Sequence, residues 1–356
     1  MSKYTKRPKK KSKKWLIPVL IVAIVALVIG AGAAVLRQYY NMSHYVSDDQ
    51  VKAAAADLTE DEKQIIEENI EDTGLTEADE ADLRAMAEAA QKDVTLPENK
   101  DVYNILLIGV DRRDESWNGN SDSMILLSIN KKTKTMHMIS FMRDLYADIP
   151  GHGIRKLNAA HAYGGAPLLI ETIQNNYGVH IDNYASVNFN NLIDIIDMVG
   201  GVELEMSDEE AKLANQYATQ MCKLRGVDPA AHMLPGGGTY NCDGYQAVAY
   251  ARIRYVGNAD YQRTERQRTV LTKIMEKAKG MGLSELNRFA QMILPLVTHN
   301  IDSSTVMSLM VQLPAILNYD VEKDRVPYDG MFSSRGEILV PDMGATIAKL
   351  QETLYS

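Results

Sequence analysis

The sequence predicts an α/β fold, a layered α-β-α domain with a central mixed sheet, preceded by one transmembrane helix and a helical stalk. Three features of the 356-residue chain support this fold class. A long uncharged apolar segment lies near the N-terminus, continuous apolar runs follow residue 101, and segments with helical spacing alternate with them. Continuous apolar runs are typical of strands buried on both faces, and strands mixed with helices are typical of layered α/β domains.

The N-terminal segment predicts a membrane anchor. Residues 1–14 carry eight lysines and arginines and no acidic residue, and residues 16–36 are 21 uncharged residues. A helix of that length spans about 30 Å, enough to cross a bilayer core. Because the basic flank of such a helix stays in the cytoplasm, we expect a cytoplasmic tail, an anchor over residues 15–37 and an extracytoplasmic remainder. A signal peptide cleaved near Ala31–Ala33 is the alternative, and the length of the apolar run favours the retained single-pass anchor.

The charge of the chain is unevenly distributed. The formal net charge is -9, but the basic tail conceals a balance of -17 in the rest of the chain. Non-specific nucleic-acid binding depends on neutralising phosphates, so an acidic body of this kind predicts no nucleic-acid partner.

The two cysteines, Cys222 and Cys242, both lie outside the membrane in this topology. Disulfides persist in that environment, but the spacing alone leaves open whether these two residues pair. Without nearby pairs of histidines they do not predict a metal site.

Residues 38–100 predict an acidic helical stalk. The segment is rich in alanine, glutamate and aspartate, and its scattered apolar positions predict two or three amphipathic helices. Gly74 and Pro97 are expected to interrupt them. We expect this segment to lift the next domain off the membrane, since its acidity repels anionic lipid headgroups.

The main domain is expected over residues 101–280, followed by a helical extension over residues 281–356 that packs on it. The predicted strands are residues 102–110, 124–129, 135–141, 184–189 and 202–206. The predicted helices are residues 167–177, 191–199, 243–255, 260–280, 285–299, 303–317 and 342–353. A longer insertion, residues 207–240, separates the last strand from the helices that follow it.

Charged residues gather where the predicted strands begin and end. Asp111 follows the first strand, Asp122 precedes the second, and Arg143 and Asp144 follow the third. Ligands of open α/β sheets bind at strand ends, so these positions are candidates for a site. Solvated loop charges are the competing interpretation, and this pattern alone does not separate the two.

Further cationic and amide side chains precede or occupy the predicted helix over residues 260–280, namely Arg252, Arg254, Arg263 and Gln267. Arg263 and Gln267 are four residues apart and therefore share a helix face. Guanidinium groups bind phosphate oxygens through paired hydrogen bonds, and several around one pocket need a multiply charged anion such as a pyrophosphate. The carboxylates Asp111 and Asp122 would repel that anion unless a divalent cation such as Mg²⁺ lay between them. Ordinary surface ion pairing remains the alternative.

Several longer stretches resemble one family. NILLIGVDRR, SDSMILLSINKKT, ISFMRDLYADIPG, RKLNAAHAYGG, and AVAYARIRY followed by DYQRTERQR occur in the order and at the spacing of the catalytic domain of the LytR–CpsA–Psr family of Gram-positive envelope enzymes. The resemblance covers about residues 103–280. It implies a phosphotransferase that takes a glycopolymer (teichoic acid, capsule or a related polysaccharide) from undecaprenyl pyrophosphate and joins it to peptidoglycan, with undecaprenyl phosphate leaving.

The resemblance also implies roles for individual residues. Asp122 matches the family's essential aspartate, Asp111 matches the aspartate associated with the metal-bound pyrophosphate, and Arg143 matches the arginine of an SFPRD-like motif. The residues that match the phosphate-holding positions are Arg252 or Arg254, Arg263 and Gln267. We therefore expect Asp122, Arg143 and Arg263 to be catalytic, and Asp111 and Asp122 to bind Mg²⁺. Asn120 departs from the pattern, because the family often has arginine there.

Two other functions would use the same residues. One is a non-catalytic, membrane-anchored binder or sensor of polyprenyl-phosphate lipids, and the other is a lipid pyrophosphatase in which water replaces the sugar hydroxyl. In every case the prenyl tail needs an apolar groove, which the helices over residues 167–177, 191–199 and 269–281 are candidates to form.

Overall fold

The computed structural model describes residues 37–356 except 39, 93, 111–117, 255 and 257–259. A seven-stranded sheet forms its centre, in the order β1-β10-β7-β2-β3-β4-β11. The strands are β1 (His44–Tyr45), β10 (Thr298–His299), β7 (Asn183–Asn188), β2 (Val102–Val110), β3 (Ser121–Asn130), β4 (Thr135–Phe141) and β11 (Asp320–Val326). β2 runs antiparallel to β3 and parallel to β7, and β11 runs parallel to β4, so the sheet is mixed as predicted.

The central strands form because their apolar runs can be buried on both faces. β2 and β4 have the predicted bounds, and Leu106, Leu126 and Met138 on β2, β3 and β4 are fully buried. β3 begins at Ser121, three residues before the predicted start, so that Asp122 lies inside the strand.

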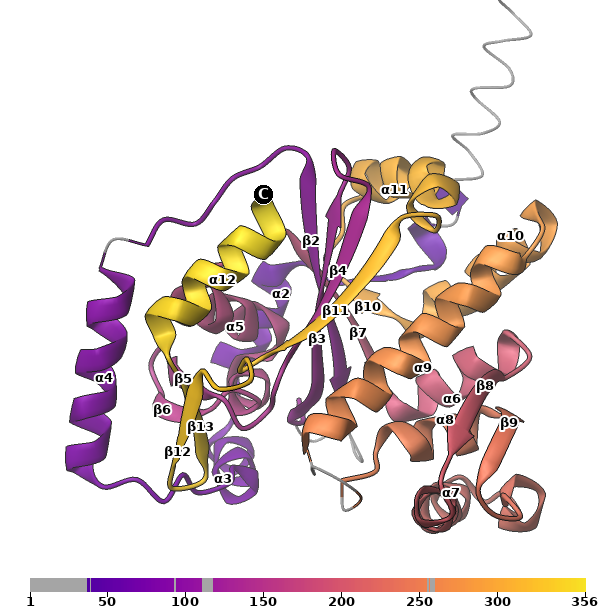
Figure 1. Cartoon of the computed structure of the whole chain (residues 1–356), viewed down its shortest axis with the longest axis horizontal. Coiled ribbons are helices and arrows are strands. Elements are labelled where there is room, and N and C mark those ends of the chain that lie inside the picture. Colours follow the sequence, from indigo (N-terminus) through magenta and orange to yellow (C-terminus); the bar gives the residue numbers. More distant parts are fainter. Residues whose placement is uncertain (1–36, 39, 93, 111–117, 255, 257–259) are drawn as a thin grey trace, which may run out of the picture.

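Helices cover both faces of the sheet (Figure 1). One face carries α5 (Ala159–Tyr177), α12 (Met343–Tyr355) and α4 (Glu77–Gln91), and α12 packs against the other two. The opposite face carries α6 (Phe189–Met198), α8 (Gly244–Ala251) and α9 (Asp260–Gly280), with α9 packed on β3 and β4. The predicted α-β-α layering is therefore present.

The segment over residues 38–100 contains the expected helices, α2 (Asp48–Ala56), α3 (Glu60–Asn69) and α4. Each begins with a capping box, in which the N-cap hydroxyl and the side chain three residues later satisfy each other's backbone amides. Ile66 of α3, and Leu83 and Ala87 of α4, belong to the same hydrophobic core as β2 and α5. The segment predicted as a stalk thus packs against the domain. The spacing of its apolar residues predicted the helices, but it did not identify the surface on which those helices pack.

The insertion after β8 (Val202–Met206) is a small helical lobe. It contains α7 (Asp208–Arg225), a 3-10 turn (Pro229–His232) and β9 (Gly238–Cys242), which pairs with β8. Cys222 and Cys242 are both free thiols buried in the core of this lobe, so no disulfide joins them. Burial, with a smaller contribution from Asp243, raises the pKa of Cys242 to about 12.

The region over residues 281–356 is not wholly helical, which corrects the prediction. It contains α10 (Leu283–Ile293), a 3-10 turn (Leu294–Leu296) and α11 (Ser303–Ile316), and α12 packs on the domain as expected. The missed strands are β11 and the hairpin of β12 (Phe332–Arg335) and β13 (Ile338–Pro341), together with the short β10. β11 was not predicted because it is an edge strand and its sequence, DVEKDRV, lacks the apolar run that identifies a buried strand.

No helix among the described residues is long and apolar enough to cross a membrane. The anchor predicted over residues 15–37 lies, apart from Arg37, outside those residues.

Candidate active site

The candidate site lies at one edge of the central sheet, where β2, β4 and β7 end and β3 begins. β4 leads directly into Arg143, and the start of β3 supplies Asp122. α9 crosses this edge and adds Arg263 and Gln267. Another hairpin, β5 (Tyr146–Ile149) and β6 (Gly153–Lys156), follows β4 and ends at Lys156.

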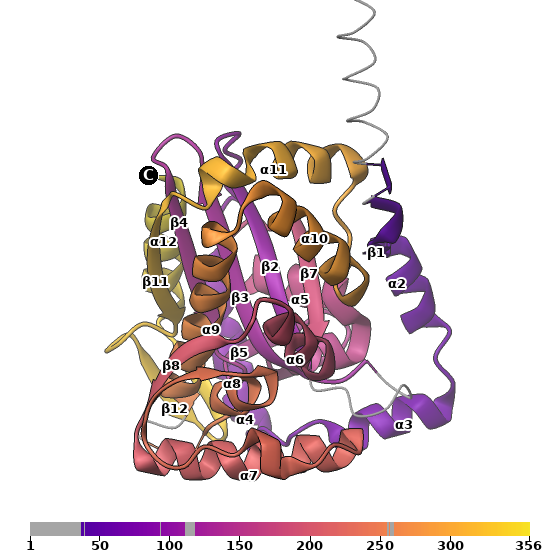
Figure 2. The ribbon, with the colours of Figure 1, turned by 90° about the vertical axis from the view of Figure 1, so that its right-hand side faces the viewer.

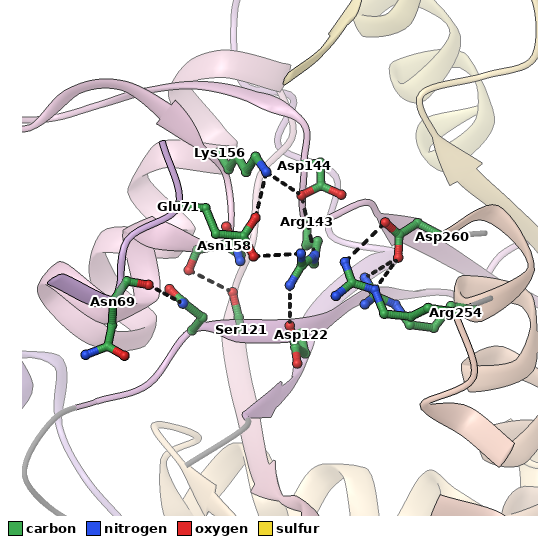
Figure 3. A network of polar contacts seen from close by, with 12 residues as sticks. Asn69, Glu71, Ser121, Asp122, Arg143, Asp144, Lys156, Asn158, Arg254 and Asp260 are labelled. Carbon is green, nitrogen blue, oxygen red and sulfur yellow. Dashed lines mark hydrogen bonds and ion pairs between the residues drawn. The ribbon is translucent and has the colours of Figure 1, made fainter. Parts of the chain in front are cut away.

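Arg143 is at the centre of the site (Figure 3). Its Nη1 is 3.2 Å from Oδ1 of Asp122, its Nη2 is 2.8 Å from Oε1 of Glu71, and its Nε is 3.4 Å from Oδ1 of Asp144. Only 10% of its side chain is exposed. Burial lowers the pKa of Arg143, but the surrounding carboxylates outweigh that effect and raise the pKa above its ordinary value. Arg143 is therefore a fixed cation.

Lys156 is a second cation of the site that the sequence analysis did not select. Its Nζ lies 2.6 Å from Oε2 of Glu71 and 3.4 Å from Oδ1 of Asp144, and 7% of its side chain is exposed. Lys156 lies in the RKLNAAHAYGG stretch that resembles the family, and this was the feature of the sequence that could have identified it as a site residue. Glu71 has no such feature, because it reaches the site from the loop after α3, 72 positions before Arg143.

A second group of charges adjoins the first. Oδ1 of Asp260 lies 3.1 Å from Nε of Arg254 and 3.1 Å from Nη2 of Arg263, whose side chain is 4% exposed. Burial raises the pKa of Asp260, but Arg263 and Arg254 outweigh it and bring the pKa to about 2. The carboxyl group of Asp144 lies near Asp260, and its pKa is raised chiefly by burial and also by Asp260. Asp144 therefore connects Arg143 and Lys156 to the group of charges around Asp260.

Gln267 and Arg252 have different positions relative to this network. Nε2 of Gln267 donates to the backbone oxygen of Asp122 over 3.3 Å, so Gln267 is part of the site. The guanidinium of Arg252 lies instead over two aromatic rings, 4.7 Å from the centroid of Phe189 and 5.8 Å from that of Tyr217. The structure therefore brings Asp122, Arg143, Arg254, Arg263 and Gln267 together, while Arg252 packs on the aromatic rings beside them.

The formal charges of the described site residues balance. The cations are Arg143, Lys156, Arg254 and Arg263, and the carboxylates are Glu71, Asp122, Asp144 and Asp260. An anion with several charges can enter such a site only if a carboxylate moves away, takes up a proton, or is neutralised by a cation. Binding of a pyrophosphate therefore requires one of these three changes.

An apolar cavity of about 220 Å³ adjoins the network. The residues that line it come from the sheet and from α6, α8 and α9, and they include Ile108, Ile125, Val187, Leu192, Ile195, Val248, Val270 and Ile274. Phe189, which lies under Arg252, and Gln267, which contacts Asp122, also line it. The groove expected between the helices over residues 191–199 and 269–281 is thus present. The expectation for residues 167–177 was wrong, because α5 covers the opposite face of the sheet (Figure 1).

The remaining predictions from the sequence concern the metal ligand Asp111 and the amide Asn120. Asp111 lies outside the described residues, and within those residues no group of three or more His, Cys, Asp and Glu side chains is placed to hold a metal ion. Nδ2 of Asn120 donates to the backbone oxygen of Asn69 over 3.4 Å, so this amide joins the residue before β3 to the C-terminal end of α3.

The site thus combines clustered guanidinium and ammonium groups with an adjoining apolar cavity. The LytR_cpsA_psr family profile matches residues 68–354. The chain belongs to the LytR–CpsA–Psr family.

Individual relatives agree with this assignment. Biofilm regulatory protein A of Streptococcus mutans serotype c is 33% identical over 260 residues, which cover 67% of this chain and 60% of that protein. The polyisoprenyl-teichoic acid–peptidoglycan teichoic acid transferase TagU of Enterococcus faecalis is 32% identical over 217 residues, covering 60% of this chain and 65% of the relative. The matched part is therefore less than two thirds of the length of either relative.

Solved structures share the fold. The crystal structure of Bacillus subtilis TagT matches with a TM-score of 0.55 and 25% identity, covering 72% of this chain and 92% of TagT. A structure of the LytR-CPS2A-psr family protein YwtF (TagT) with bound octaprenyl pyrophosphate lipid matches with a TM-score of 0.52 and 25% identity, covering 75% of this chain and 98% of that one.

Proposed function

We propose that this protein transfers a glycopolymer from an undecaprenyl-pyrophosphate carrier to peptidoglycan and releases undecaprenyl phosphate. The observation that carries the proposal is the position of Gln267, which contacts Asp122 in the charged network and also lines the apolar cavity. A lipid pyrophosphate has the same two parts, an anionic head joined to an apolar chain. The relative that contains octaprenyl pyrophosphate and the relatives named as teichoic acid transferases support the assignment.

In the proposed reaction a sugar hydroxyl of peptidoglycan attacks the phosphorus that carries the glycopolymer. A new phosphorus–oxygen bond forms, the bond from that phosphorus to the bridging oxygen breaks, and undecaprenyl phosphate leaves with the electron pair. In this proposal Arg143 and Arg263 stabilise the negative charge that develops on the phosphoryl oxygens. We assign to Asp122, 3.2 Å from Arg143, the role of accepting the hydroxyl proton or holding a cation.

Mg²⁺ fits the charge of the site. The described cations and carboxylates already balance, so a pyrophosphate needs extra positive charge, which a divalent ion held by Asp122 and Asp111 would supply. Oδ1 of Asp122 is 3.2 Å from Nη1 of Arg143, so a metal ion at Asp122 would share this carboxylate with Arg143. Asp122 and Asp111 are the residues we propose as its ligands.

We also propose that residues 15–37 anchor the protein in the cell membrane with a single pass, the N-terminus in the cytoplasm and the catalytic domain outside. The basic tail followed by 21 uncharged residues supports this topology. It would place the site on the side of the membrane where peptidoglycan lies.

The test uses the full chain in detergent with Mg²⁺, a lipid-pyrophosphate glycan and peptidoglycan oligomers. Wild type is compared with Asp122→Asn and Arg263→Gln, and with Lys273→Gln as a control on the same helix, since Lys273 pairs with Glu276 away from the site. We expect glycan attached to peptidoglycan in the wild type and the control, and a loss of at least about a hundredfold in the two site variants. Phosphate release without attachment would indicate a pyrophosphatase. Tight lipid binding without any product would indicate a binder or sensor.

A further inference from the structure

α11 is an unusually apolar helix for its exposure. Its sequence, SSTVMSLMVQLPAI, contains no charged residue, and Ile316 is its single buried side chain. Val311 is 75% exposed. A helix on the surface of a soluble domain normally has charged or strongly polar residues on its outer face. The outer face of α11 instead carries Ser304, Ser308, Val311 and Ala315.

The N-terminal end of α11 lies beside the point where the described chain begins. β1 pairs with β10, and the His299 ring of β10 lies 6.3 Å from Tyr40 and 6.0 Å from Tyr45. Asp302, the N-cap of α11, is close enough to contribute to the raised pKa of Tyr40, whose main cause is burial. Both views show α11 lying across this end of the molecule (Figures 1 and 2).

The C-terminal end of α11 adjoins a basic turn. The turn between β3 and β4 contains Lys131, Lys132 and Lys134, and the backbone amide of Asp320, four residues after α11, donates to the Lys134 oxygen over 3.1 Å. Asp101 also contacts the turn, where its backbone oxygen accepts from Lys131 over 2.8 Å. The turn thus has three lysines against two aspartates, which favours an anionic surface.

We propose that α11 and the β3–β4 turn form a membrane-contact surface, with α11 lying in the plane of the headgroups. The inference rests on the proposed anchor, because residues 16–36 end one residue before the described chain and would hold the bilayer close to Tyr40, Tyr45 and α11. An uncharged helix with a basic flank and nearby tyrosines matches a lipid–water interface.

The proposed surface also leads to the apolar cavity. Leu309 and Ile316 of α11 belong to the hydrophobic cluster that contains Ile125 and Leu271, and both of these residues line the cavity. Val297, which lines the cavity as well, directly precedes β10. Docking of α11 on the bilayer would therefore hold the cavity near the prenyl chain of a membrane-embedded donor.

A quenching experiment on the full chain tests this surface. Val311→Cys is labelled with an environment-sensitive fluorophore, as is Leu224→Cys on α7, where residue 224 is 80% exposed at the opposite end (Figure 2). The native thiols are buried, and the labelled wild type measures their background. The proteins are reconstituted in vesicles of phosphatidylcholine and phosphatidylglycerol that contain a lipid-attached spin-label quencher.

We expect the label at position 311 to shift to the blue and to be quenched by the lipid-attached quencher, and the label at position 224 to be quenched by aqueous iodide alone. Equal iodide quenching at the two positions, in protein that floats with the vesicles, would overturn the inference while leaving the anchor and the proposed function intact. Protection of position 311 from both quenchers, growing with the protein-to-lipid ratio, would assign α11 to contact with a second copy. Wild-type protein that does not float with the vesicles would remove the anchor and this inference together.

Kinetics give a second measurement. With a long-chain donor in vesicles, Val311→Glu is expected to raise KM several-fold relative to Leu224→Glu, because a buried carboxylate opposes docking. With a short-chain donor in detergent the two variants should be equal. A KM change in both conditions would mean that Val311 affects the site itself, and it would contradict the membrane role.

Discussion

Glu71→Gln isolates the role of the carboxylate that lies between Arg143 and Lys156. Glu71 is 2.8 Å from Arg143 and 2.6 Å from Lys156, so it occupies the position that two phosphate-binding cations would offer to a ligand. Burial raises the pKa of Glu71, but Lys156 and Arg143 outweigh that effect and hold the pKa below its ordinary value, so the group is ionised at neutral pH. A pyrophosphate must compete with this internal anion. We therefore expect Glu71→Gln to bind prenyl pyrophosphates more tightly than wild type.

The size of the effect follows from the two contacts. The Glu71 side chain is 42% exposed, so solvent screens both ion pairs and each contributes about 0.5–1 kcal/mol. Removing both lowers the cost of admitting the ligand by about 1–2 kcal/mol, which corresponds to binding about 5- to 30-fold tighter. The same contacts stabilise the fold, so the free energy of unfolding should fall by a similar amount.

The assay is calorimetric titration of the full chain in detergent with geranyl pyrophosphate, a short-chain probe that does not need a membrane. Glu68→Gln is the matched control, because Glu68 lies on α3 three residues earlier and accepts a hydrogen bond from Gln64 outside the site. Its affinity for the probe should equal that of wild type.

Weaker or unchanged binding by Glu71→Gln would refute the competition argument. If binding is unchanged and kcat falls, Glu71 instead positions Arg143 and Lys156 during the reaction. Failure of every variant, wild type included, to bind the probe would count against the proposed function and not against the role of Glu71 alone.

Three further predictions concern Lys156, Asp260 and the cavity. Lys156→Met removes one of the two buried cations that contact Glu71 and Asp144 and leaves Arg143 as the other. It should lower the free energy of unfolding by about 3 kcal/mol, measured by urea denaturation. Lys132→Met on the exposed β3–β4 turn should have little effect. Asp260 has a folded-state pKa of about 2, below the unfolded value of about 3.9, so its stabilisation is present above that unfolded value and is lost as pH falls towards about 2. Asp260→Asn should therefore unfold less steeply between about pH 4 and pH 2, and an unchanged acid limb would contradict the proposed pairing with Arg254 and Arg263. Ala185→Leu projects into the cavity and should weaken binding of a long prenyl pyrophosphate by more than about tenfold, since each displaced CH₂ costs about 0.8 kcal/mol, while leaving inorganic pyrophosphate affinity unchanged.

Local patterns in the sequence were sufficient to predict the central strands and some of the residues of the site. β2 and β4 have the predicted bounds because a continuous apolar run specifies a buried strand without reference to its partners. The positions of Asp122 and Arg143 next to strand ends followed from the same runs. Arg263 and Gln267 shared a face because helical spacing alone requires it.

Contacts between distant parts of the chain decided the rest. Glu71 and Lys156 meet although 85 positions separate them, and β11 joins the sheet beside β4 although its own sequence is polar. The sequence could not place Arg252 on the ring of Phe189, nor assign α5 to the face away from the cavity. A residue's hydropathy and spacing specify its local conformation and which side of an element is apolar. The partner that covers that side, and the charges that gather beside it, depend on how the elements pack, because packing brings together groups that no local pattern relates.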